Sequence, residues 1–160
     1  MGYIGALAVI VGVYIIWREY SAFLDRELRL CRAFVRAVSD YKEKVRCYMD
    51  SPKDWAEGYT DDTLSELGFL LNLRDGADFK EAYGAMRGNL HITDELNEIL
   101  TSCFDRLGDG YLDTELETLD TAVVKLRSEE DRISLNLSKR WKAAGAMLGA
   151  FALGTVILVI

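Results

Sequence analysis

Residues 111 to 160 read YLDTELETLDTAVVKLRSEEDRISLNLSKRWKAAGAMLGAFALGTVILVI, and this stretch decides how the rest of the chain can fold. Its first part has apolar residues in alternating steps of four and three, the spacing of a coiled-coil-like helix. They are Leu112, Leu116, Leu119, Val123, Leu126, Ile133 and Leu137, interrupted only at Glu130. Eighteen residues without a charge follow, from Ala143 to Ile160. The stretch predicts one long helix that begins in water and ends in a bilayer.

A second uncharged stretch opens the chain, because residues 1 to 17 carry no charged side chain. It predicts another transmembrane helix. The alternative is a cleaved signal peptide, but the stretch lacks a basic segment before it and a small-residue cleavage pattern after it. Lys and Arg flank both stretches only on the side of residues 18 to 142, so the positive-inside rule places this central domain in the cytoplasm. We expect transmembrane helices at 1–17 and 143–160 around a cytoplasmic helical domain at 18–142.

Basic and aromatic residues collect where the predicted spans meet the central domain. We define the membrane collar as Trp17, Arg18, Lys139, Arg140, Trp141 and Lys142. Amphipathic rings and cations are favoured at the membrane interface. Within the spans, small residues four apart would let two helices pack closely, although small residues are also simply common in membrane helices; they are Ala8, Gly12, Gly145 and Gly149.

The first span continues into a helix with the same seam spacing as the last one. Its seam residues are Leu24, Leu28, Cys31, Val35, Val38, Val45 and Met49, with Lys42 as the exception. Because both helices enter the membrane from one side, they run antiparallel, and positions whose numbers sum to about 160 lie level. This register sets the acidic residues 129 to 131 beside Arg29 and Arg32. It offers Lys42 no obvious partner.

Four short helices are predicted between the two long ones. Ser51 and Pro52 begin the first, which stops at Gly58, and residues 60 to 62 begin the second, which ends near Gly76. The third runs from 77 to 87, and Thr93 caps the fourth. The residues expected to face inward are Leu64, Leu67, Leu70, Leu71, Phe79, Tyr83, Met86, Leu96, Ile99, Leu100, Cys103, Phe104 and Leu107. The fold class is all-α: an antiparallel bundle of about six helices, flanked by transmembrane helices that continue into it.

No residue pattern predicts catalysis, a cofactor or a metal. The net charge of −7 disfavours nucleic acid, and phosphate-binding glycine loops are absent. Three widely spaced cysteines suggest buried, reduced thiols, while the lone His91 suits a loop or a capping role. An Asp-rich segment at 105–116 fails as a calcium loop, because leucines occupy two of its ligand positions. We therefore expect a protein that is not an enzyme.

Acidic residues concentrate in two stretches that the antiparallel arrangement would place farthest from the membrane. We define the acidic tip as Asp54, Glu57, Asp61, Asp62, Asp109, Asp113 and Glu117. It suits a docking face for a basic cytoplasmic partner. The alternative is a solvated surface whose acids repel the anionic leaflet.

The order of these features resembles stage III sporulation protein AB. The resemblance rests on Leu107-Gly108 before a long charged helix, the basic Lys139 and Lys142, Leu148-Gly149 and a terminal span. Residues 49 to 90 match only in length and helical character, and residues 43 to 48 (EKVRCY) match the family's usual run only loosely.

This resemblance implies a structural component of the channel between mother cell and forespore, in the mother-cell membrane around the forespore. It also implies a fold similar to the cytoplasmic domain of type II secretion inner-membrane platform proteins. The implied partners are a secretion-type ATPase and other membrane components of the channel. The alternative function is a membrane-bound helical signalling or regulatory adaptor that binds a soluble cytoplasmic partner.

Overall fold

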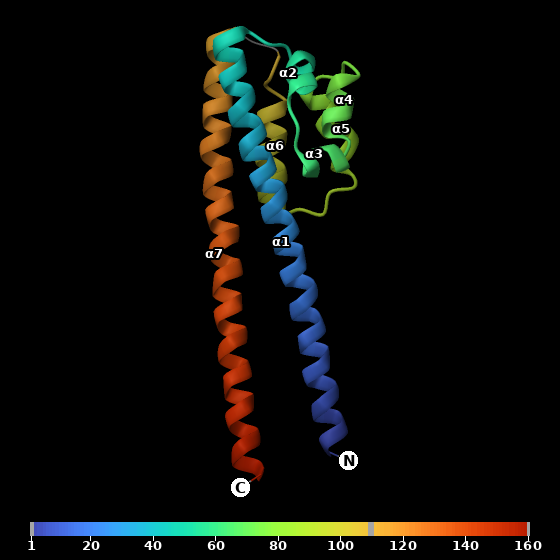
Figure 1. The fold of residues 1–160 in the computed structure, drawn as a ribbon, viewed down its shortest axis with the longest axis vertical. Helices are drawn as coiled ribbons and strands as arrows, with labels where there is room; N and C mark the ends of the chain where they lie inside the picture. Colours follow the sequence, from blue (N-terminus) through green and yellow to red (C-terminus); the bar gives the residue numbers. More distant parts are fainter. Residues whose placement is uncertain (1, 109–110, 160) are drawn as a thin grey trace. The chain divides into compact units, whose positions relative to one another are not determined.

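The structure is a computed structural model that describes the backbone of residues 2–108 and 111–159, and the side chains of 11–12, 14–108 and 111–144. These residues form helices and no strand, which confirms the all-α prediction (Figure 1). The seven helices are α1 (Gly2–Tyr48), α2 (Pro52–Gly58), α3 (Asp62–Glu66), α4 (Phe69–Arg74), α5 (Phe79–Arg87), α6 (Asp94–Phe104) and α7 (Leu112–Val159).

The chain divides into two compact units, to which α1 and α7 both contribute. One unit consists of Met1–Arg26 and Asp131–Ile160, and we call it the terminal unit. The other is Glu27–Glu130, the central unit, which contains all of α2 to α6. Figure 1 shows these five short helices gathered beside the central unit's part of α1.

The predicted transmembrane helices at 1–17 and 143–160 fall largely outside the described side chains, which exclude 1–10 and 145–160. Over the described residues, none of the helices has the length and apolar character needed to cross a membrane. The two spans therefore stay predictions.

Within the central unit, α1 and α7 pair along the predicted seams. Leu28, Cys31, Val35, Val38 and Val45 of α1 are buried, as are Leu119, Val123 and Leu126 of α7. The predicted antiparallel register is confirmed by an ion pair between Arg32 Nε and Glu130 Oε1, 2.8 Å apart.

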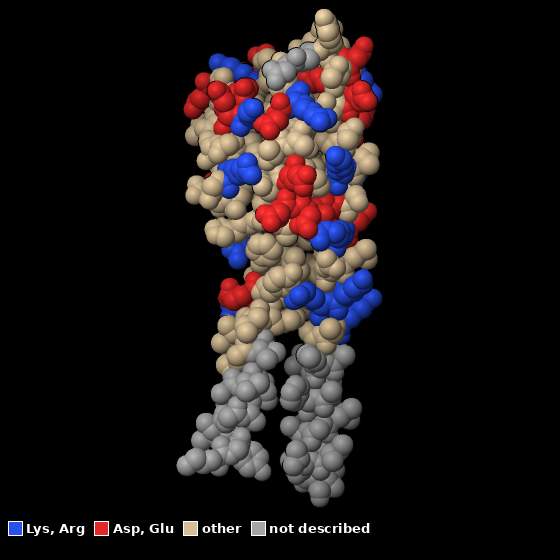
Figure 2. Space-filling model, turned by 180° about the vertical axis from the view of Figure 1, so that it is seen from behind, with Lys and Arg blue, Asp and Glu red and all other residues tan. Residues whose placement is uncertain are grey.

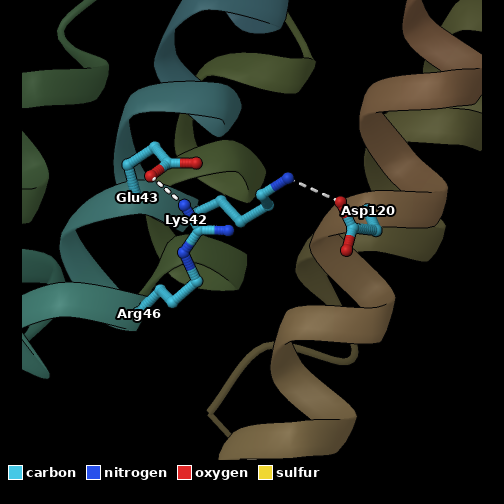
Figure 3. A network of polar contacts seen from close by, with 4 residues as sticks. All are labelled: Lys42, Glu43, Arg46 and Asp120. Carbon is cyan, nitrogen blue, oxygen red and sulfur yellow. Dashed lines mark hydrogen bonds and ion pairs between the residues drawn. The ribbon is translucent and has the colours of Figure 1, made fainter.

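Lys42 has a partner, which the sequence analysis missed. Its Nζ lies 2.6 Å from Asp120 Oδ1 of α7 (Figure 3). The predicted register set Lys42 level with residue 118, and a long lysine side chain reaches a carboxylate two positions away. Figure 3 also shows Arg46 paired within α1 with Glu43, at 2.6 Å. The polar interruption of the α1 seam is thus a link between the two long helices.

Met49 does not belong to the α1 seam, contrary to the prediction. Its φ of 57° is left-handed, a conformation that costs a side-chain-bearing residue energy and ends a helix. Its N–H donates to the Val45 carbonyl at 3.0 Å and closes the last turn of α1. The side chain is 75% exposed, so the seam ends at Val45.

The predicted second helix is two helices, which accounts for seven helices rather than six. Gly68 has a φ of 76°, a left-handed conformation that suits glycine, and it separates α3 from α4. Its N–H donates to the Ser65 carbonyl at 3.0 Å. Because the turn changes the helical phase, Leu71 is exposed where it was expected inside, and Leu73 is buried instead.

An aromatic cluster forms the core of the central unit. Phe104 of α6 lies with its ring centroid 5.8 Å from Phe34, 5.7 Å from Phe69, 5.6 Å from Phe79 and 5.4 Å from Tyr83. The predictions of Phe79, Tyr83 and Phe104 as inward-facing are confirmed. Because Phe34 comes from α1 and Phe69 from α4, this cluster ties the short helices to a long one.

Candidate functional site

The structure brings three residues of the membrane collar together with Tyr20 in the terminal unit. Trp17 of α1 and Trp141 of α7 meet edge to face, with ring centroids 5.4 Å apart at 86°. The guanidinium carbon of Arg140 lies 3.8 Å from the ring centroid of Tyr20, a cation–π contact between the same two helices. Aromatic rings and one cation thus join α1 to α7 at this level.

The other collar cations are exposed. Arg18, Lys139 and Lys142 form no ion pair with any described residue, although the acidic Glu19 follows Arg18 in the chain. The terminal unit has three acidic and six basic residues, a net charge of +3, whereas the central unit has 23 acidic and 13 basic residues, a net charge of −10. Basic residues therefore predominate in the terminal unit and acidic residues in the central unit, as the sequence analysis predicted.

The small residues of the predicted span packing are mostly outside the described side chains. This holds for Ala8, Gly145 and Gly149. A Cβ atom added at Gly12 would meet no atom of the described residues within 4 Å. The packing of the two spans through these small residues therefore stays a prediction.

Most of the acidic tip is exposed, but one member has a structural role. Asp54, Glu57, Asp62, Asp113 and Glu117 are exposed. Asp61 is the N-cap of α3, where it accepts a hydrogen bond from the Leu64 N–H at 3.1 Å. It also pairs with Arg36 at 2.7 Å, and its side chain is only 7% exposed. The prediction of Asp61 as a residue of the docking face is therefore corrected, because its carboxylate is engaged inside the protein. Asp109 lies outside the described residues.

Three of the exposed acids border grooves of the central unit, and Asp54 lines one of about 300 Å³ together with Lys44, Asp50 and Trp55. A groove of about 490 Å³ between α6 and α7 contains Glu117 together with Arg106, Lys125 and several hydroxyl groups. A groove of about 900 Å³ between α1 and the start of α3 contains Asp62 with Arg36, Asp40 and Glu43. Figure 2 shows basic side chains beside acidic ones on the face it draws. The two acidic stretches thus do not line one common hollow among the described residues.

A buried glutamate of α1 is the main polar residue that the sequence analysis missed. Glu27 is 1% exposed, and its Oε1 accepts hydrogen bonds from the Thr93 N–H at 2.7 Å and the Thr93 hydroxyl at 2.6 Å. Thr93 stands at the N-cap position of α6 as predicted, but its side chain makes no bond to the helix. Its hydroxyl is instead used as a donor to Glu27.

A sequence signal for this contact existed. Glu27, Phe34 and Tyr41 lie seven residues apart on α1 and are all buried. Together with Leu24, Cys31, Val38 and Val45 they continue the four-three spacing. A second stripe beside the predicted seam is what a helix shows when it packs against neighbours on two sides. Glu27 is the one charged residue of that stripe, because it accepts the hydrogen bonds that Thr93 donates at the start of α6.

The three cysteines differ in exposure, and the prediction of buried thiols is wrong for one of them. Cys31 and Cys103 are buried, whereas Cys47 is exposed in the last turn of α1. The Cys31 thiol donates to the Leu126 carbonyl at 3.4 Å. Burial raises the pKa of Cys31 and of Cys103 to about 12. Both buried thiols therefore stay protonated and unreactive near neutral pH.

We expect one thiol per chain to react with a disulfide reagent at pH 8. Cys47 should react within seconds to minutes, and Cys31 and Cys103 only on unfolding. Counting over time the thiolate that the reagent releases, with wild-type and Cys47→Ser chains, checks this reactivity. Two fast-reacting thiols in the wild type would contradict it.

The two buried thiols also make stability depend on pH. Because the pKa of Cys31 and Cys103 in the folded chain exceeds the unfolded value near 9.0, the thiols of the unfolded chain lose their protons at a lower pH. The free energy of unfolding should therefore fall as pH rises above about 9.

The described residues contain no group of three or more His, Cys, Asp or Glu side chains that could hold a metal ion. His91 is exposed between α5 and α6, as a loop residue. What the arrangement offers chemically is two charged surfaces: exposed carboxylates on the central unit and exposed cations beside tryptophans on the terminal unit.

The chain matches no model of a known protein family, no curated protein and no solved structure.

Proposed function

We propose that this chain is a non-enzymatic membrane platform component of the sporulation channel between mother cell and forespore, which scaffolds the complex and docks a secretion-type ATPase. The resemblance of residues 107 to 160 to stage III sporulation protein AB supports the channel. Two membrane-spanning ends, at 1–17 and 143–160, would hold the central domain in the cytoplasm, in the mother-cell membrane around the forespore. Other membrane components of the channel would be further partners.

The collar supports attachment to the membrane. Its cations and tryptophans come from both long helices, next to the two uncharged stretches. Tryptophan and basic residues favour the headgroup region of a bilayer. A net charge of +3 on the terminal unit and −10 on the central unit directs the basic part toward anionic lipid.

One observation carries the docking proposal: two carboxylates at the start of α7 have no partner among the described residues. They are Asp113 and Glu117, both exposed. Their neighbours are engaged, because Asp120 binds Lys42 and Glu115 accepts the Tyr41 hydroxyl at 3.2 Å. Exposed, unpaired acids can bind a basic partner without breaking contacts inside the protein, and they speed its association. Tyr111, two residues before Asp113, is 89% exposed and adds apolar contact area.

Charge reversal at three acids should abolish docking. We expect Asp62→Lys, Asp113→Lys and Glu117→Lys together to reduce co-purification of the ATPase from sporulating cells at least tenfold, about 1.4 kcal/mol of binding free energy. Asp61 is left unchanged, because its reversal would remove an N-cap and an ion pair. Helix content by circular dichroism should stay the same, since all three side chains are exposed.

The matched control reverses three exposed acids elsewhere in the central unit. Glu66→Lys, Asp75→Lys and Glu98→Lys change the net charge equally, and these exposed side chains have no partner among the described residues. We expect this variant to retain the ATPase. Equal loss in both variants would mean that only net charge matters, and retention in both would remove the acidic tip as a docking face. Normal spore development after deletion of the gene would instead favour the regulatory adaptor.

A further inference from the structure

The terminal unit presents cations, rings and aliphatic side chains in an ordered series along α1. Val11, Tyr14, Ile15 and Ile16 are exposed, and Trp17 and Arg18 follow directly. On α7, Lys139, Trp141 and Lys142 occupy the same level, since Trp17 touches Trp141 and Arg140 covers Tyr20. The order is apolar side chains, then aromatic rings, then cations. It matches the parts of a phospholipid from its acyl chains to its phosphate.

We propose that Arg18, Lys139 and Lys142 bind the phosphate of an anionic phospholipid headgroup, with Trp17 and Trp141 beside its glycerol backbone. The inference rests on the proposed membrane location and adds the lipid class. Each cation is exposed and has no ion-pair partner among the described residues. The phosphate would therefore gain charge-assisted hydrogen bonds without displacing a protein carboxylate.

Arg140 has a different role from the other three cations. Its guanidinium lies over the Tyr20 ring at 3.8 Å, so it holds α7 against α1. The edge-to-face contact of the tryptophans acts at the same level. These two contacts fix the separation of the two helices, so Arg18 of α1 and the two lysines of α7 are held on one collar. Glu19 is the acid beside Arg18, and the local charge remains positive, with four cations against one acid.

An acidic protein is the other class of partner for a cationic surface, and the observations favour lipid. Exposed isoleucines next to tryptophans would be left in water by a partner that binds only the cations. A bilayer covers both. The two classes also differ in a measurable way, because only lipid places acyl chains next to Trp17 and Trp141.

The test uses the full chain reconstituted in vesicles with brominated acyl chains, which quench nearby tryptophan fluorescence. Of the three tryptophans, Trp55 is buried in the central unit, so quenching reports on Trp17 and Trp141. Vesicles contain phosphatidylcholine and phosphatidylglycerol in one fixed ratio, with bromine on one lipid at a time. We expect phosphatidylglycerol to be enriched at the tryptophans about fivefold or more over its bulk fraction, about 1 kcal/mol.

Arg18→Gln, Lys139→Gln and Lys142→Gln together should remove the preference and leave total quenching unchanged. The matched control, Lys53→Gln, Arg87→Gln and Arg106→Gln, changes three exposed cations of the central unit and should keep the preference for phosphatidylglycerol.

An excess of soluble glycerol phosphate at constant ionic strength should not compete with the lipid, and competition would overturn the need for a lipid. Quenching by each lipid in proportion to its bulk fraction overturns the headgroup site alone. Absence of quenching by either lipid overturns the membrane location as well.

Discussion

Replacing Phe104 with alanine is expected to lower the free energy of unfolding of the central unit by about 3 to 5 kcal/mol. The ring is fully buried and lies within 6 Å of four other aromatic centroids, which belong to α1, α4 and α5. Truncation would leave a cavity where these helices meet, and rigid rings cannot collapse into it. Such a loss is a large part of the 5 to 15 kcal/mol that stabilises a typical domain.

Urea unfolding measured through Trp55 checks this prediction. Trp55 packs against Tyr41 and Phe79, so its fluorescence reports on the same core. Trp17→Phe and Trp141→Phe in the background leave it as the sole tryptophan. Tyr111→Ala is the control, because its side chain is exposed, and it should change stability by less than about 0.5 kcal/mol. A loss below about 1 kcal/mol for Phe104→Ala would mean that the cluster is not the core.

The second large effect is expected at Glu27. Glu27→Ala removes the acceptor of both the Thr93 N–H and the Thr93 hydroxyl, at 2.7 and 2.6 Å. A buried donor left without a partner costs about 1 to 3 kcal/mol, and the half-buried Thr93 would lose the acceptor of two donors. The carboxylate also faces the positive N-terminal end of α6, which stabilises a negative charge. We therefore expect a loss of about 3 kcal/mol.

Two further variants separate the contact from the volume of the side chain. Glu27→Gln keeps one acceptor oxygen and should lose about 1 to 2 kcal/mol. Thr93→Val removes only the hydroxyl, and its effect should largely vanish in the Glu27→Ala background, because the two groups act as one pair. Additive losses in this double-mutant cycle would show that the two residues contribute independently. Destabilisation by Glu27→Gln equal to that by Glu27→Ala would assign the effect to charge alone.

Several features of the fold follow from the spacing of residues alone. The four-three spacing of apolar residues indicated two long helices, and the two uncharged ends of the chain indicated an antiparallel register. That register set residues 129 to 131 beside Arg32, and the ion pair between Arg32 and Glu130 confirms it. Helix starts at Ser51 and Thr93 were also readable, because both residue types favour the N-cap and Pro52 suits the first helical position. These are local signals, since a helix repeats every 3.6 residues and its ends need specific side chains.

Other features depended on contacts between residues far apart in the chain. The left-handed turn at Gly68 split one predicted helix into two and exposed Leu71. A single glycine in a helical pattern is compatible with either outcome, so packing decides. The sequence placed Asp61 both at a helix start and in the acidic tip, and only the tertiary structure shows its ion pair with Arg36 of α1.

The sequence by itself determined the helical class, the antiparallel pairing of α1 and α7, and the separation of basic from acidic residues, because periodicity and charge are properties of the chain order. Only the tertiary structure decided which polar residues are internal. Glu27 is buried because Thr93, 66 positions away, supplies its donors, and Lys42 is paired because Asp120 lies within its reach. The collar combines both: its residues are visible in the sequence, while the contact of Trp17 with Trp141 comes from the packing of two helices.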